Sequence, residues 1–217
     1  MRKDMVLVEM QTSEETDKAV SSLDGAVHTM VTALNTGTVR PAAGELVNGT
    51  SGIARDVSGL VRDASGLVRD LSGAVNNDGT VEHYKRIAQM IQDLCRETER
   101  FSRYCRTFTD LVTREHPDDM LEDVRSLICD AYGIVRNTFH LIHFVLEGME
   151  SGSEINRSLV QRVKCIKKKV SEQEQCTDMA RDPEEISFMF PGASGLVRDI
   201  SGVARDLSGV IRNNGWR

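Results

Sequence analysis

Three side chains in the second half of the chain have the types and the spacing of a metal-binding face. His140, His143 and Glu147 follow one another at intervals of three and four residues, so a helix would place them on one side. Two neutral imidazoles and a carboxylate are ligands that zinc accepts. No distant residues complete a tetrahedral site, and the same helical side carries Glu122 and Arg125. We therefore expect a solvated helix face here, with a metal-dependent enzyme as a remote alternative.

The cysteines are spaced for neither a disulfide framework nor a zinc cluster. Their number is odd, and no CxxC pair occurs among Cys95, Cys105, Cys129, Cys165 and Cys176. Cys129 shares the side of the histidines, but no local signature of a cysteine enzyme surrounds it. We expect reduced thiols without a catalytic role, and we assign no catalytic residue, no metal and no cofactor.

Nucleotide and nucleic-acid binding are not indicated either. The 17 glycines include no GxxxxGK[ST] and no GxGxxG pattern. The chain has 27 Lys and Arg against 33 Asp and Glu, a net charge of −6, whereas binding to a phosphate backbone needs a concentrated positive field. A local basic cluster runs from Arg162 to Lys169. We interpret it as a solvated helix face, the alternatives being contact with an acidic protein, nucleic acid or anionic lipid.

The composition is that of an ordinary globular chain. Its 217 residues are 40% hydrophobic and 5% aromatic, with four prolines, which favours helices over an aromatic-rich sandwich and allows one or two domains. The apolar run Met5–Val8 is too short for a signal-peptide core, and no later segment approaches a membrane span. We expect a cytoplasmic protein.

A seven-residue repeat occurs in two blocks. SGIARDV, SGLVRDA and SGLVRDL run on from Ser51, and SGLVRDI and SGVARDL return from Ser194. An odd period would move the apolar residues of a strand from one face to the other, so the period indicates helix. With Val57, Ala64 and Leu71 at heptad position a, positions d and e are also apolar, whereas Ser lies at b, Arg at f and Asp at g. The a, d and e residues form a stripe wide enough to contact more than one neighbouring helix. Because g carries Asp and e carries Val or Ala, g-to-e ion pairs are not expected to fix a partner, and the near-identical heptads should tolerate a slip by one repeat.

The residues of this stripe form the predicted interaction surface. They are Val57, Leu60, Val61, Ala64, Leu67, Val68 and Leu71 in the first block and Leu196, Val197, Ile200, Val203 and Leu207 in the second. Such a stripe is too apolar to leave in water. We expect it to pair with the other block or with a second copy of the chain.

The other long segments have helical periodicity. A capping box at Thr12-x-x-Glu15 predicts the start of a helix that ends at Asn35-Thr36-Gly37. A helix from Val81 to Arg114 is stopped by His116-Pro117. Two further helices are predicted, one up to Gly148 and the other toward Cys176.

Together these patterns predict an all-α helical bundle with two amphipathic heptad-repeat arms. The expected segments are an N-terminal helix (1–42), a first arm (43–79), a central helical unit (80–176), a connector (177–193) and a second arm (194–217). We expect a non-enzymatic structural or adaptor protein that acts through helix–helix contacts, as a homo-oligomer or with its arms paired within one chain, on an unknown protein partner. Peripheral binding of the repeats to a membrane surface is the less favoured alternative, because Asp flanks the stripe and Arg lies opposite it.

Overall fold

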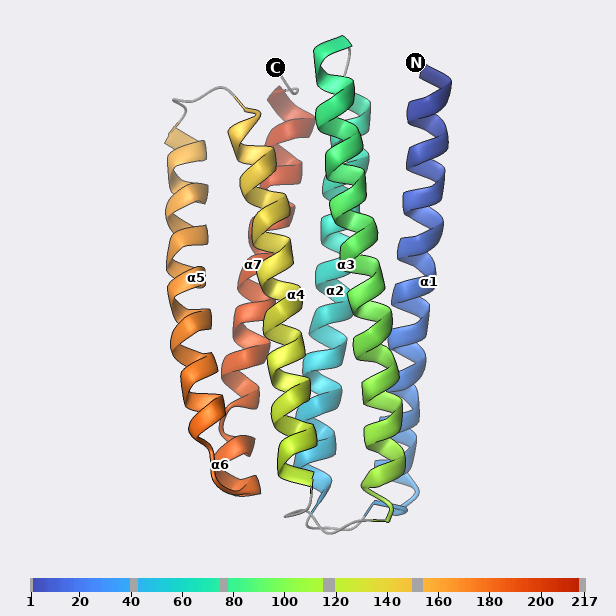
Figure 1. Ribbon diagram of the computed structural model, residues 1–217, viewed down its shortest axis with the longest axis vertical. Helices are drawn as coiled ribbons and strands as arrows, with labels where there is room; N and C mark the ends of the chain where they lie inside the picture. The colour runs from blue at the N-terminus through green and yellow to red at the C-terminus, as the bar shows by residue number, and fades with distance from the viewer. Residues whose placement is uncertain (1, 40–42, 75–77, 115–119, 150–153, 215–217) are drawn as a thin grey trace.

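Long helices stand side by side in the computed structural model of the chain (Figure 1). The structure describes residues 2–39, 43–74, 78–114, 120–149 and 154–214. These residues form α1 (Arg2–Asn35), α2 (Gly44–Ala74), α3 (Asp78–Leu111), α4 (Leu121–Glu147), α5 (Glu154–Met179), the short α6 (Pro183–Ser187) and α7 (Phe190–Asn214). They contain no strand, so the predicted all-α bundle is confirmed.

Helix α2, which carries the first repeat block, is the central helix. It packs most extensively against α7 and also contacts α1, α3 and α4. The three helices α1, α2 and α3 contact one another, and so do α4, α5 and α7. The bundle therefore consists of two three-helix groups, and their buried apolar side chains merge into one continuous core. The expectation that a repeat block contacts several helices is confirmed.

The start of α1 differs from the prediction. The helix already begins at Arg2, so Thr12 lies in its interior and is not an N-cap. Thr12 and Thr16 are buried, and the Thr16 hydroxyl donates to the Thr12 carbonyl at 2.7 Å. A Ser or Thr that bonds back to the preceding turn satisfies its hydroxyl inside a helix, which is why the capping-box pattern was misleading here.

The predicted end of α1 is confirmed. Gly37 has a φ of 68°, the left-handed conformation that glycine adopts without strain. The amides of Gly37 and Thr38 donate to the carbonyls of Leu34 and Ala33 at 3.3 and 3.2 Å. These bonds close the last turn and direct the chain toward α2.

Two further boundaries bear on the predictions. Helix α4 ends at the expected Gly148, whereas the predicted stop at His116-Pro117 lies outside the described residues. The expected connector is largely helical: α6 is capped by Asp182, whose carboxylate accepts from the Glu185 amide, and α7 begins at Phe190, ahead of the repeats. Sequence reasoning missed this part because α6 is a single turn.

Candidate functional site

The twelve residues of the predicted interaction surface are buried inside the chain. None of them is more than 4% exposed. They lie on α2 and α7, which run alongside each other through the interior of the bundle. The surface is therefore an internal seam in this fold, with the two arms paired within one chain. A second copy could reach these residues only if the bundle opened.

Ion pairs of one kind cross this seam at seven-residue intervals. They join Asp56 to Arg198, Asp63 to Arg205 and Asp70 to Arg212, with N–O distances of 3.5, 3.2 and 3.2 Å. Ser201 and Ser208 also donate their hydroxyls to Asp63 and Asp70. We call these contacts the ladder. Because the residue numbers rise together on both helices, α2 and α7 are parallel.

The same arrangement continues on either side of the seam. Asp24 of α1 accepts a hydrogen bond from Ser58 of α2 at 2.7 Å and pairs with Arg62. On the other side, Arg162 of α5 pairs with Asp206 of α7. Side chains of α5 thus donate to α7, side chains of α7 donate to α2, and side chains of α2 donate to α1.

The expectation that ion pairs would not fix a partner concerned only one kind of contact. It considered contacts between heptad positions g and e, as in a two-stranded coiled coil. In the bundle, each Asp of α2 at g instead meets the Arg at f, and in two of three cases the Ser at b, of a parallel neighbour. The Asp, Arg and Ser of the repeat were evident in the sequence. Which of them meet across two helices depends on the bundle geometry, which the repeat alone does not reveal.

The ladder sets the register only to within seven residues, since a slip by one repeat would place equivalent residues together. A contact outside the repeats selects one register. The ring of Phe190, which is buried, rests on Gly49 so closely that a Cβ atom there would overlap it. At Gly59 and Gly66, by contrast, an added Cβ would meet no atom within 4 Å.

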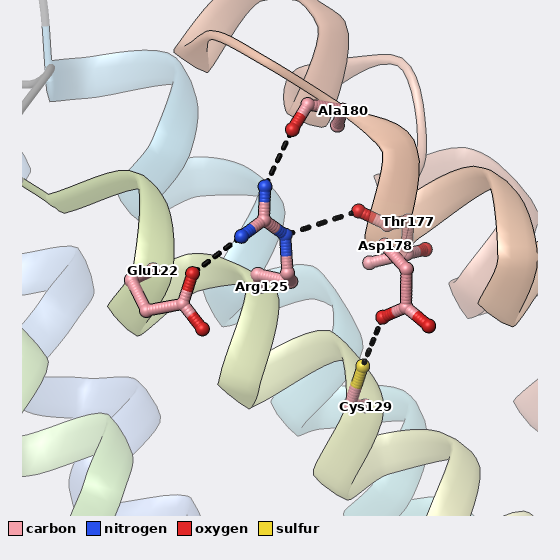
Figure 2. Close-up of polar contacts among 6 residues, drawn as sticks. All are labelled: Glu122, Arg125, Cys129, Thr177, Asp178 and Ala180. Atoms are coloured by element: carbon pink, nitrogen blue, oxygen red, sulfur yellow. Dashed lines mark hydrogen bonds and ion pairs between the residues drawn. The ribbon is translucent and has the colours of Figure 1, made fainter.

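The charged side of α4 is partly covered by the end of α5, and not fully solvated as expected (Figure 2). Arg125 Nε donates to the Thr177 carbonyl at 3.2 Å, and the same guanidinium donates to the Ala180 carbonyl and pairs with Glu122. Carbonyls at a helix C-terminus lack partners within the helix and carry partial negative charge. Arg125 thus holds the end of α5 against α4.

Cys129 lies one turn further along α4, and its environment keeps the thiol protonated. Its Sγ atom is 4.0 Å from Asp178 Oδ1 (Figure 2). Burial raises the pKa of the Cys129 thiol, and the carboxylates of Asp178 and Glu174 raise it further. Because the thiolate is the nucleophile, this geometry does not favour catalysis by Cys129.

The three candidate metal ligands do not converge on a site. His140, His143 and Glu147 are all exposed, and His143 Nδ1 lies 3.2 Å from Glu147 Oε1 in a contact along the helix. Among the residues that the structure describes, no group of three or more His, Cys, Asp or Glu side chains is placed to hold a metal ion. The remote metal-enzyme alternative gains no support from this geometry.

A hollow between α3 and α4 has a volume of about 320 Å³. Its walls include the apolar side chains of Phe108 and Leu127 and the carboxylates of Asp123 and Asp130. Arg100 donates to Asp130 at 3.0 Å, so that carboxylate is already engaged. Sequence reasoning did not find this hollow, because it depends on how two separate helices pack against each other.

The basic cluster lies on the exposed side of α5. Lys164, Lys167, Lys168 and Lys169 are all exposed, while Val163 and other apolar residues of α5 face the core. Lys168 contacts Glu172 at 3.5 Å. The cluster is thus a charged face at the edge of the bundle (Figure 1).

Comparison with family models, curated proteins and solved structures found no match for this chain. Within the described ranges, no helix combines the length and the apolar composition needed to cross a membrane. The function must therefore be argued from the surfaces that the fold leaves exposed.

Proposed function

We propose that the protein is a non-enzymatic structural or adaptor protein that binds other proteins through exposed helix faces, chiefly that of α5. The observation that carries this proposal is the exposed basic run of α5: residues 157–169 include six Lys and Arg and no Asp or Glu. Charged faces steer association and choose partners. Helix α5 packs against α4 and α7 and leaves these side chains along its outer face.

The buried thiols support action in the cytoplasm. Cys95 and Cys105 are free and buried on α3, and unpaired cysteines of this kind suit a reducing compartment. In this proposal the repeats pack against each other in the manner of a coiled coil and form the buried contact between α2 and α7. Binding to other molecules, including self-association, is left to the outer helices.

Quantitative cross-linking in a native cell extract tests the proposal. A variant with Lys164→Ala, Lys167→Ala and Lys169→Ala is compared with wild type and with a control that removes three exposed cations of α3, Lys85→Ala, Arg96→Ala and Arg103→Ala. We expect the α5 variant to keep its melting temperature but to lose particular cross-linked proteins that the control retains. If both variants and wild type capture the same proteins, the α5 face is a solvated surface and the proposal fails.

The lipid alternative fits this fold less well. The apolar face of the repeats would have to leave the core to reach a membrane, because Leu60, Leu67 and Ile200 are fully buried. Flotation with liposomes separates the alternatives. Flotation of the folded wild-type protein, abolished by changes to the repeats but not to α5, would favour lipid binding.

A further inference from the structure

The exposed side of α5 is divided into a basic half and an acidic half. Residues 157–169 contain six cations and no anion, whereas residues 172–185, which run on into α6, contain six anions and the single cation Arg181. The helix forms an edge of the bundle, with its buried side against α4 and α7 (Figure 1). Within α5, the exposed Lys164, Lys167, Lys168 and Lys169 precede the exposed Glu172 and Asp178, so the charge changes sign along the helix. Arg162 and Glu174 lie nearer the bundle and pair with α7 and α4.

From this division we infer that the α5 face binds a second copy of the same chain, with the two α5 helices antiparallel about a two-fold axis at the level of Val170. In such a contact the basic half of each copy meets the acidic half of the other, so one surface is complementary to itself. The inference rests on the proposed function, since it names the partner of the α5 face.

The residues nearest the axis have the symmetry that this contact needs. Lys168 and Glu172 lie two positions on either side of Val170 and already contact each other along the helix, with side chains 80% and 59% exposed. In the dimer, Lys168 of each copy faces Glu172 of the other. The two pairs form one network of four charges, which is stronger than an isolated surface pair.

The residues farther from the axis follow the same pattern. Lys164 is exposed six positions before Val170, and Asp178 is exposed eight positions after it. Antiparallel packing brings them to nearby levels on opposite copies, since each residue adds about 1.5 Å of rise. The exposed apolar residues of α5, Val160 and Met179, are 37% and 70% exposed. Val160 lies ten positions before Val170 and Met179 nine positions after it, so Val160 of one copy lies at about the height of Met179 of the other.

A polyanion fits this face less well than a second copy. A membrane or a nucleic acid presents continuous negative charge, which would be attracted to residues 157–169 but repelled by residues 172–185 and by the net charge of −6. An antiparallel copy satisfies both halves. Because one helix pair is smaller than a standard interface, the dimer is weak and depends on salt.

Analytical ultracentrifugation of the purified full-length protein tests the inference. The mass is measured from about 10 µM to about 1 mM protein, a range suited to weak complexes, in roughly 50 mM and roughly 500 mM salt. We expect a monomer–dimer equilibrium at low salt that shifts to monomer at high salt. The basic-half variant, Lys164→Glu with Lys168→Glu, and the acidic-half variant, Glu172→Lys with Asp178→Lys, should each dimerise at least tenfold more weakly.

The decisive sample is an equimolar mixture of these two variants. One variant has carboxylates, and the other has ammonium groups, at all four of positions 164, 168, 172 and 178, so the mixture should form a dimer with one copy of each. The control reverses the same number of charges on α3, with Lys85→Glu and Arg103→Glu, both exposed in the structure, and should dimerise like wild type. Circular dichroism and thermal melting of each variant check that the helix content and the stability stay at the wild-type level.

Four results would overturn the inference. The wild type could stay monomeric at the highest concentration in low salt. The mixed variants could stay monomeric. The acidic-half variant could dimerise like wild type, which would mean that the basic half does not contact the acidic half in the dimer. Finally, monomeric wild type could bind phosphatidylserine vesicles or polyuridylate at physiological salt, which would identify the face as a polyanion site. Because these samples contain only purified protein, absence of a dimer leaves the extract cross-linking test of the proposed function intact.

Discussion

At the scale of single residues, glycines of one helix differ in what surrounds them. Gly49 and Gly59 both lie in α2. A methyl group at Gly49 would overlap the buried ring of Phe190, whereas at Gly59 it would meet no atom within 4 Å. We expect Gly49→Ala to lower the free energy of unfolding by about 1–3 kcal/mol through overpacking. Gly59→Ala should raise it by about 0.5–1 kcal/mol, because alanine is the better helix former.

Urea denaturation followed by circular dichroism measures both changes. Gly66→Ala provides a second case in open space and should resemble Gly59→Ala. If Gly49→Ala were as stable as wild type, Phe190 would not be seated against α2, and nothing outside the repeats would then select the register of the seam.

The buried thiols predict how stability changes in alkaline solution. Burial raises the pKa of Cys95 to about 11 and that of Cys105 to about 12, from a usual value of 9.0. Between the unfolded and folded pKa values, the unfolded chain has released the thiol protons while the native chain retains them. The free energy of unfolding should therefore be unaffected by these groups below pH 9 and fall above it, by at most about 1.4 kcal/mol per pH unit for each thiol.

Thermal unfolding between pH 8 and pH 11 checks this prediction, with a Cys95→Ala, Cys105→Ala variant as the reference. The difference in slope between the two proteins isolates the thiols from other alkaline effects, including those of the buried tyrosines. Labelling at pH 8 is an independent check: the exposed Cys165 and Cys176 should react at once, and the buried pair only after unfolding. Equal slopes, together with rapid labelling of all thiols, would contradict the assigned burial.

At the scale of elements, the ladder predicts which aspartates matter. Asp63 of α2 accepts from Ser201 and pairs with Arg205. Removing it with Asp63→Ala leaves the Ser201 hydroxyl, on a residue only 6% exposed, without its acceptor. We expect a loss of about 1–2 kcal/mol in the free energy of unfolding.

Asp199 is the matched control, since it holds the same heptad position on α7. It is exposed, and no described residue is recorded as its hydrogen-bond or ion-pair partner, so Asp199→Ala should cost no more than about 0.5 kcal/mol. Chemical denaturation of both variants measures the difference. Equal losses in the free energy of unfolding would mean that the ladder consists of solvated pairs that do not stabilise the contact between α2 and α7.

The ladder also marks how far the sequence could be interpreted. The heptad period predicted the helices and their buried stripe, because side-chain burial follows directly from spacing on a helix. The partner of each Asp could not be predicted, since it depends on whether the neighbouring helix is parallel or antiparallel. The role of Arg125 was missed for a similar reason: its acceptors on Thr177 and Ala180 lie more than fifty residues away in the sequence.

At the scale of the whole molecule, one core joins both repeat blocks to the other helices, and α2 contacts α1, α3, α4, α6 and α7. Damage at the centre of α2 should therefore unfold the entire chain, not one arm. Leu60 and Leu67 are fully buried, and truncating a buried leucine costs about 2–5 kcal/mol. Placing a carboxylate there costs more. The loss in the free energy of unfolding caused by Leu60→Asp together with Leu67→Asp should therefore exceed the roughly 5–15 kcal/mol of stability that a domain possesses.

We expect this double variant to lose the circular dichroism signal of all helices together. The thiols of Cys95 and Cys105, which lie on α3 and not on α2, should become reactive at the same time. Arg69→Ala is the control on the same helix, because Arg69 is exposed, and it should keep the wild-type melting temperature within a few degrees. Partial loss of helix with protected Cys95 and Cys105 would mean that α1 and α3 to α5 fold without the repeats. Wild-type helicity, mass and melting temperature would mean that the repeats do not form the core, because no folded bundle of this kind accommodates two unpaired carboxylates at its centre.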